Sequence, residues 1–233
     1  MLPESISILL NHIHFERGHL KKPFRKYVET TLRENSLVIT CGLPGTWKTE
    51  ISEELSKLKG YTILRTDLIR RNLLKNEDIF DEKVASNMDK RRMIYEEMFR
   101  LTEELFIKVD SVILDATFIT QSLRKQAAAM AAKYNKTFVI LQTSCPQEIA
   151  IERILKRSRE NYESNALTEQ AYLNNKNKFE EVVLDDLKPL NTKPDIIHLI
   201  VDTSKDTPED WYIIGTERKQ DIETLTRHSS KIE

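Results

Sequence analysis

Eight consecutive residues combine glycine, lysine and threonine in a spacing that suits phosphate binding. They are Gly42, Leu43, Pro44, Gly45, Thr46, Trp47, Lys48 and Thr49. In the pattern G-x-x-x-x-G-K-[ST], backbone N–H groups curl around phosphate, the lysine reaches the β and γ oxygens, and the last hydroxyl binds Mg²⁺. Seven of the eight positions fit, so the segment predicts a nucleoside triphosphate site with Lys48 on phosphate and Thr49 as a magnesium ligand.

Trp47 is the departure from this pattern, because it stands where the second glycine belongs. Glycine at that position lets the backbone approach phosphate with no Cβ in the way. The indole ring could crowd the nucleotide or reshape the loop, or it could point away from the phosphates or stack on the nucleotide. Two alternatives therefore stay open: a loop with weakened or lost nucleotide binding, and an ordinary glycine turn followed by lysine and threonine.

Two aspartates follow apolar runs and are candidates for proton transfer and metal binding. Asp67 comes after the run 61–65, where a carboxylate is placed to accept the proton of an acceptor hydroxyl during phosphoryl transfer. Asp115 comes after the run 111–114, where an acid that holds Mg²⁺ is expected. Helix capping by Asp67 and a strand-end turn at Asp115 are the structural alternatives. Thr117 could hydrogen-bond the acceptor or merely begin the next loop.

Basic residues near these acids could hold phosphate or an anionic acceptor. Arg70 and Arg71 follow Asp67, and because neighbouring helical residues point about 100° apart, at most one of them faces a shared cleft. Arg153 and Arg157 are spaced i, i+4, which favours them as a pair on one helix face that stabilises the transferring phosphoryl group. Solvated basic helix faces are the alternative for both pairs.

The order of the elements predicts an α/β domain that brings these residues to one edge of a sheet. Strand-length apolar runs occupy 37–41, 61–65, 111–114, 137–142 and 196–201, and segments with helical spacing lie between them. Alternating strands and helices predict parallel pairing in a three-layer domain that binds ligands at the carboxyl ends of its strands.

The same pattern sets the expected domain limits. Residues 36–204 form the α/β domain, residues 1–35 form a helical N-terminal extension, and residues 205–233 form a C-terminal tail. Within that tail, the run 211–214 could add one more short strand.

Composition excludes several classes of protein. The 233 residues fit one domain, and 36 Lys and Arg against 37 Asp and Glu give a formal net charge of −1, which disfavours a global attraction to nucleic acid. No apolar run approaches the ~18 residues that cross a bilayer, and no export signal is recognised, so we expect a cytoplasmic location.

Two further features of the sequence do not indicate a site. Cys41 and Cys145 form no CxxC zinc motif. The basic segment 14–26 could contact nucleic acid but is more typical of a solvated helix face.

Five motifs, in this order and spacing, give the chain a family resemblance. GLPGTWKT, RTDLIRRNLL, VILDATF, LQTSCPQEIAIERILKR and VDTS resemble those of P-loop kinases of the zeta-toxin and polynucleotide-kinase-like type, often labelled AAA-type ATP-binding domains. The resemblance covers approximately residues 36–204. It implies a P-loop NTPase fold with a five-stranded parallel sheet of strand order 2-3-1-4-5, a second acid that acts on the acceptor, and an arginine-rich lid at about 153–170.

Motifs and resemblance together predict an ATP-dependent, Mg²⁺-requiring phosphotransferase that moves the γ-phosphoryl group to a hydroxyl of a small molecule or nucleotide. The expected partners are a nucleoside triphosphate and an unidentified phosphoryl acceptor, with no membrane. Two alternatives stay open: a binding or regulatory protein of the same fold, and a nucleic-acid 5′-end kinase that uses the basic segment.

Overall fold

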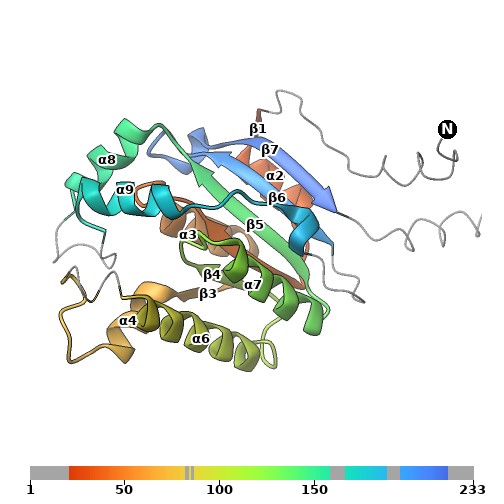
Figure 1. Cartoon of the computed structure of the whole chain (residues 1–233). Coiled ribbons are helices and arrows are strands. Elements are labelled where there is room, and N and C mark those ends of the chain that lie inside the picture. The colour runs from red at the N-terminus through yellow and green to blue at the C-terminus, as the bar shows by residue number, and fades with distance from the viewer. Residues whose placement is uncertain (1–20, 82–83, 85–86, 158–165, 188–194, 220–233) are drawn as a thin grey trace, which may run out of the picture.

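A seven-stranded sheet forms the centre of the part of the chain that the structure describes (Figure 1). The computed structural model describes residues 21–81, 84, 87–157, 166–187 and 195–219. The strands are β1 (Lys22–Pro23), β2 (Ser36–Cys41), β3 (Thr62–Arg65), β4 (Val112–Asp115), β5 (Thr137–Ser144), β6 (Ile196–Asp202) and β7 (Tyr212–Lys219). Their order across the sheet is β1-β7-β6-β5-β2-β4-β3.

This sheet is mixed rather than wholly parallel. Strands β2 to β6 pair in parallel, whereas β7 pairs antiparallel with β6, and β1 antiparallel with β7. The expectation of a five-stranded parallel sheet is therefore wrong, because two antiparallel strands extend the β6 edge. Strand β7 comes from the segment expected to be the C-terminal tail, and it runs along β6 from Ile196↔Lys219 to Asp202↔Tyr212.

Helices cover both faces of the sheet (Figure 1). They are α2 (Phe24–Thr31), α3 (Lys48–Lys59), α4 (Thr66–Leu73), α6 (Met88–Leu105), α7 (Gln121–Lys133), α8 (Gln147–Leu155) and α9 (Glu169–Lys178). On one face α4, α6 and α7 pack against Leu37 and Ile39 of β2, and on the other α2 and α3 pack against Val38. Successive strand residues point to opposite faces, so a strand covered on both sides must be buried throughout, as β2 is.

Helix ends are marked by side chains that satisfy free backbone N–H groups. Asn87 begins α6 by accepting from the Lys90 N–H, Thr120 begins α7 by accepting from Leu123, and Thr168 begins α9 by accepting from Ala171. In α6, Ile94 and Met98 are spaced i, i+4 and are buried on one face of the helix. These caps fix where α6 and α9, which form part of the site, begin.

Most of the expected N-terminal extension, residues 1–20, lies outside the described residues. The part that follows is joined to the sheet. Phe24 and Val28 of α2 are fully buried, and the Phe24 ring meets the Trp211 ring edge-on with centroids 6.1 Å apart. The described end of the basic segment 14–26 is thus fixed to the core through Phe24. Within the described ranges, no helix has the length and apolar character needed to cross a membrane.

Candidate functional site

The loop between β2 and α3 has a backbone that its two glycines make possible. Gly42 has φ +145° and Gly45 has φ +78°, values that side-chain-bearing residues rarely adopt. A Cβ added at Gly42 would lie 2.6 Å from Thr143 Oγ1, and one at Gly45 would lie 2.3 Å from the Ala150 carbonyl oxygen. The loop is therefore pressed against β5 and α8 at both glycines.

Trp47 adopts the left-handed backbone conformation that a glycine would adopt easily, with φ 59° and ψ 38°. Such a conformation costs a non-glycine residue about 1–3 kcal/mol. Its indole ring faces the Arg153 guanidinium, whose Cζ lies 4.5 Å from the ring centroid, and its Nε1 donates to Asp206 Oδ1 at 3.3 Å. A cation–π contact of this kind contributes about 0.5–2 kcal/mol, so it offsets much of that cost.

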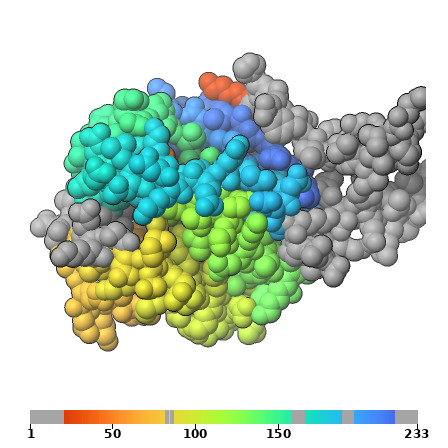
Figure 2. All heavy atoms as spheres, viewed as in Figure 1, coloured from red at the N-terminus to blue at the C-terminus, as the bar shows by residue number. Residues whose placement is uncertain are grey.

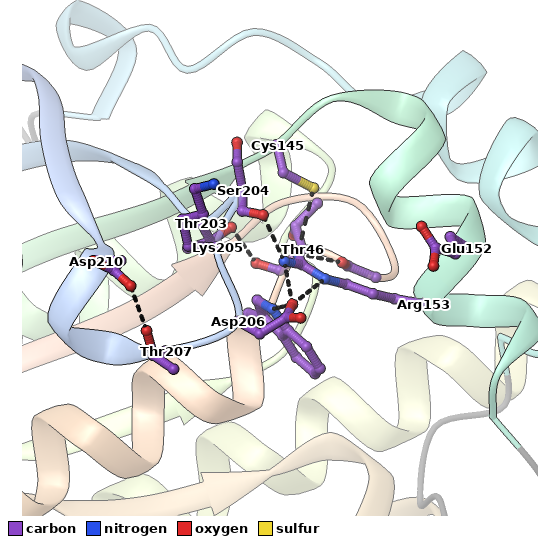
Figure 3. Close-up of polar contacts among 12 residues, drawn as sticks. Thr46, Cys145, Glu152, Arg153, Thr203, Ser204, Lys205, Asp206, Thr207 and Asp210 are labelled. Carbon is purple, nitrogen blue, oxygen red and sulfur yellow. Dashed lines mark hydrogen bonds and ion pairs between the residues drawn. The ribbon is translucent and has the colours of Figure 1, made fainter.

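Arg153 is buried between this loop and the segment after β6 (Figure 3). It donates to Asp206 Oδ1 at 2.8 Å, to the Ser204 carbonyl at 3.1 Å and to the Gly45 carbonyl at 3.4 Å. Arg153 does not line the cavity described below, whereas Arg157 does. The structure does not pair the two arginines on one helix face, because α8 ends at Leu155.

Lys48 and Thr49 open α3 and face Asp115 at the end of β4. The Lys48 ammonium donates to the Leu43 carbonyl at 2.7 Å, and burial lowers its pKa to about 8 while Asp115 opposes the change. Burial raises the pKa of Asp115 to about 6, and a hydrogen bond from Thr49 acts in the opposite direction. Arg65 Nε lies 3.8 Å from Asp115 Oδ2. A hydroxyl and a carboxylate oxygen therefore meet beside a lysine.

Asp67 lies in the first turn of α4 and forms an ion pair with Arg70. Both side chains line the cavity, and Arg71 is exposed outside it. The residue at the N-cap position is Arg65, so Asp67 does not cap the helix. Thr117 uses its carbonyl to accept from the Gly42 N–H, and its hydroxyl faces α6. Among the residues that the structure describes, no group of three or more His, Cys, Asp or Glu is placed to hold a metal.

These residues surround a cavity of about 870 Å³ at the carboxyl ends of the parallel strands. Its walls come from the loop between β2 and α3 with the first residues of α3 (residues 42–49, called the phosphate loop below), the start of α4, the end of β4, α6 and α9. In Figure 2, α9 (cyan) meets α6 (yellow) on the viewed face, and Arg91 of α6 reaches Asn175 of α9 at 3.5 Å. The volume suits a small-molecule site. Of the expected lid, 158–165 lies outside the described residues.

Several side chains that line the cavity were not among the candidate site residues from the sequence. They are Glu50, Arg65, Lys90, Arg91, Tyr95, Asn175 and Lys178. Arg65 ends the same strand that places Asp67, so its position could have been inferred. Arg91 and Tyr95 are spaced i, i+4 on α6 and share one face, which is a weaker signal. Nothing local predicts Asn175, because α9 buries only Tyr172.

A family match now adds to this geometry. A family described as AAA domain matches residues 37–182, which is more than half of the chain. The chain belongs to the AAA domain family.

Similar proteins agree with the fold of this AAA domain. A gluconokinase from Sinorhizobium meliloti 1021 superposes with a TM-score of 0.52 at 15% identity, covering 75% of this chain and 86% of that chain. A sugar kinase from Janibacter sp. HTCC2649 gives 0.52 and 15%, covering 75% and 88%. These likenesses show the α/β P-loop NTPase-like fold.

Curated relatives are longer proteins. Uncharacterized proteins of Mycobacterium tuberculosis and Mycobacterium bovis are 27% identical over 169 residues, which is 70% of this chain and 32% of each relative. The AAA domain chain thus spans about a third of the length of the curated relatives it matches.

The buried carboxylate of this AAA domain makes its stability depend on pH. Between the ordinary aspartate pKa near 4 and the value of about 6 for Asp115, the folded protein binds one proton more than the unfolded chain, so this group lowers the unfolding free energy as pH rises. Two pKa units correspond to about 3 kcal/mol. Asp115→Asn should therefore be more stable than the wild type at pH 8, by up to about 3 kcal/mol, and equally stable near pH 4. Urea unfolding without Mg²⁺ or nucleotide measures the unfolding free energy of the wild type and the variant at each pH. A variant less stable than the wild type at pH 8 would contradict the burial argument.

Proposed function

We propose that the protein transfers the γ-phosphoryl group of ATP, with Mg²⁺, to a hydroxyl group of a small molecule. One observation carries the proposal: the phosphate loop with Lys48 and Thr49 opens into the same cavity as Asp67 and Asp115. The motif resemblance to zeta-toxin and polynucleotide-kinase-like kinases supports it, and so does the fold shared with a gluconokinase and a sugar kinase.

The residues present fit the nucleotide and the metal. The indole of Trp47 is held by Arg153 and Asp206 at the side of the loop, and the backbone keeps the left-handed turn of the motif. Thr49 and Asp115 supply the oxygen donors that Mg²⁺ prefers, together with phosphate oxygens. When bound, Mg²⁺ would neutralise charge on the phosphates.

The chain's own groups would act as follows. Loop N–H groups and Lys48 bind the β- and γ-phosphates, and Arg157, which lines the cavity, contacts the phosphoryl group in transit. The bond between the γ-phosphorus and the β,γ-bridging oxygen breaks, and ADP leaves with that electron pair. The acceptor oxygen forms the new bond to phosphorus, and its proton passes to Asp67, which Arg70 holds in place.

A calorimetric titration with ATP and Mg²⁺ tests this function. We expect a dissociation constant between about 1 μM and 1 mM, the usual range for enzyme substrates, and a change in indole fluorescence that Trp47→Phe removes. Trp211 is fully buried, and its fluorescence is the signal that remains in Trp47→Phe. Absence of heat with both ATP and GTP would favour the binding or regulatory alternative. If ATP bound but no ADP formed with any compound in a panel of hydroxyl compounds, the result would favour a protein of this fold that binds nucleotide without turning it over.

A further inference from the structure

Arg91 is a cation of the cavity that hydrogen-bonds to neutral groups on two other elements. Its Nη2 donates to the Thr117 hydroxyl at 3.3 Å and to the Asn175 side-chain oxygen at 3.5 Å. Among the described residues no carboxylate forms an ion pair with it, whereas Arg70 pairs with Asp67 and Lys90 pairs with Glu77. A half-buried guanidinium with neutral partners retains the capacity to bind an anion in a bidentate manner.

The surroundings of Arg91 reinforce this. Lys178 also lines the cavity, and within the described ranges no carboxylate pairs with it. Tyr95, one turn along α6, places its hydroxyl 3.4 Å from the Thr117 hydroxyl, so it adds another donor on the same wall. Asn174 and Asn175 supply amide groups from α9. Arg91 and Lys178 are therefore two cations of the cavity for which no carboxylate among the described residues forms an ion pair, and the cavity also holds several neutral hydrogen-bonding groups.

Thr117 separates this wall from the phosphate loop. Its carbonyl accepts from the Gly42 N–H at 3.2 Å, while its hydroxyl faces Arg91 and Tyr95. Arg91 thus lies across Thr117 from the triphosphate cradle. The same cavity contains Asp67, the group that would take the acceptor's proton. An acceptor with its hydroxyl toward Asp67 can reach Arg91 with another part of the molecule.

We propose that Arg91, with Thr117, Tyr95 and Asn175, binds an anionic group of the phosphoryl acceptor, so that the substrate is a hydroxyl compound bearing a carboxylate or a phosphate. This assignment rests on the proposed phosphotransferase function and narrows its substrate class. A carboxylate and a phosphate both match a guanidinium fork, so the experiment distinguishes the two sources.

The first measurement uses binding alone. The phosphate loop is filled with Mg²⁺ and a non-hydrolysable ATP analogue, and thermal stabilisation by added inorganic phosphate is then recorded. We expect Arg91→Met to weaken phosphate binding about 10- to 100-fold and Arg91→Lys to retain part of it. Arg92→Met is the matched control, because Arg92 is 71% exposed on the same helix and pairs with Asp89 and Glu96. Equal phosphate binding by wild type and Arg91→Met would overturn the proposal.

The second measurement compares six-carbon acceptors that differ in charge: glucose, gluconate and glucose 6-phosphate. We expect at least one anionic compound to be phosphorylated with a higher kcat/KM than glucose. In Arg91→Met, kcat/KM for that compound should fall about 10- to 100-fold, whereas the KM for ATP should stay unchanged. Preference for gluconate or for glucose 6-phosphate identifies the anion. Preference for glucose in both proteins would overturn the proposal. Failure of the ATP analogue to bind would instead count against the proposed function. The two failures are distinguishable, since phosphate binding at Arg91 is measured by comparing the wild type with Arg91→Met.

Discussion

Replacing Lys48 by methionine should lower phosphoryl transfer about 10²- to 10³-fold, the cost of removing one preorganised charge from a transition state. The ammonium is partly buried beside the loop and donates to the Leu43 carbonyl at 2.7 Å, so it is held at the loop in the absence of phosphate. Methionine keeps the length and apolar character of the side chain but not the charge. Rates of ADP formation with a saturating acceptor measure the loss.

Lys57→Met is the control for this experiment. Lys57 lies in the same helix and is exposed, so its replacement should leave the rate within a factor of about two. Circular dichroism and thermal unfolding verify that both variants fold. If Lys48→Met kept the wild-type rate, the loop would not be the phosphate site, and Trp47 would mark a chain in which that site has been lost.

Strands buried on both faces were open to prediction from sequence, because most of their positions are apolar. Strand β2 is of this kind. Strand β7 was indicated only in its first half, by the run 211–214, because its second half is the polar and partly exposed stretch Thr216, Glu217, Arg218 and Lys219. This second half is held by antiparallel pairing with β6, which no local pattern of residues indicates.

The environment of Trp47 shows the same limit within the site. From sequence, the Trp47 indole could have occupied the space expected for phosphate or pointed away from it. Neighbouring residues in the sequence do not distinguish these two conformations. Its hydrogen-bond partner, Asp206, is 159 positions away, and its stacking partner Arg153 was expected to contact phosphate. Motifs predicted that Lys48, Thr49 and Asp115 line one cavity, because the order of strand, loop and helix fixes their places. They could not predict contacts that depend on how α8 and the segment after β6 pack.

Conversion of Asp67 to asparagine should lower kcat about 10²- to 10⁴-fold, the usual contribution of a positioned general base. Asparagine has nearly the same shape but cannot take up the acceptor's proton at neutral pH. Because Asp67 lies in the first turn of α4 and not in the phosphate loop, ATP affinity measured by calorimetry should stay within about threefold of the wild type.

Asp89→Asn provides a matched control, since Asp89 also pairs with an arginine three residues on but is 85% exposed on α6. The Asp67–Arg70 ion pair is mostly buried, so its loss can also cost stability, and thermal unfolding of both variants is measured alongside the rates. A large fall in kcat with intact folding separates proton transfer from a structural role. Equal rates for the two variants would assign Asp67 to the ion pair alone and leave the acceptor's proton to another group of the cavity.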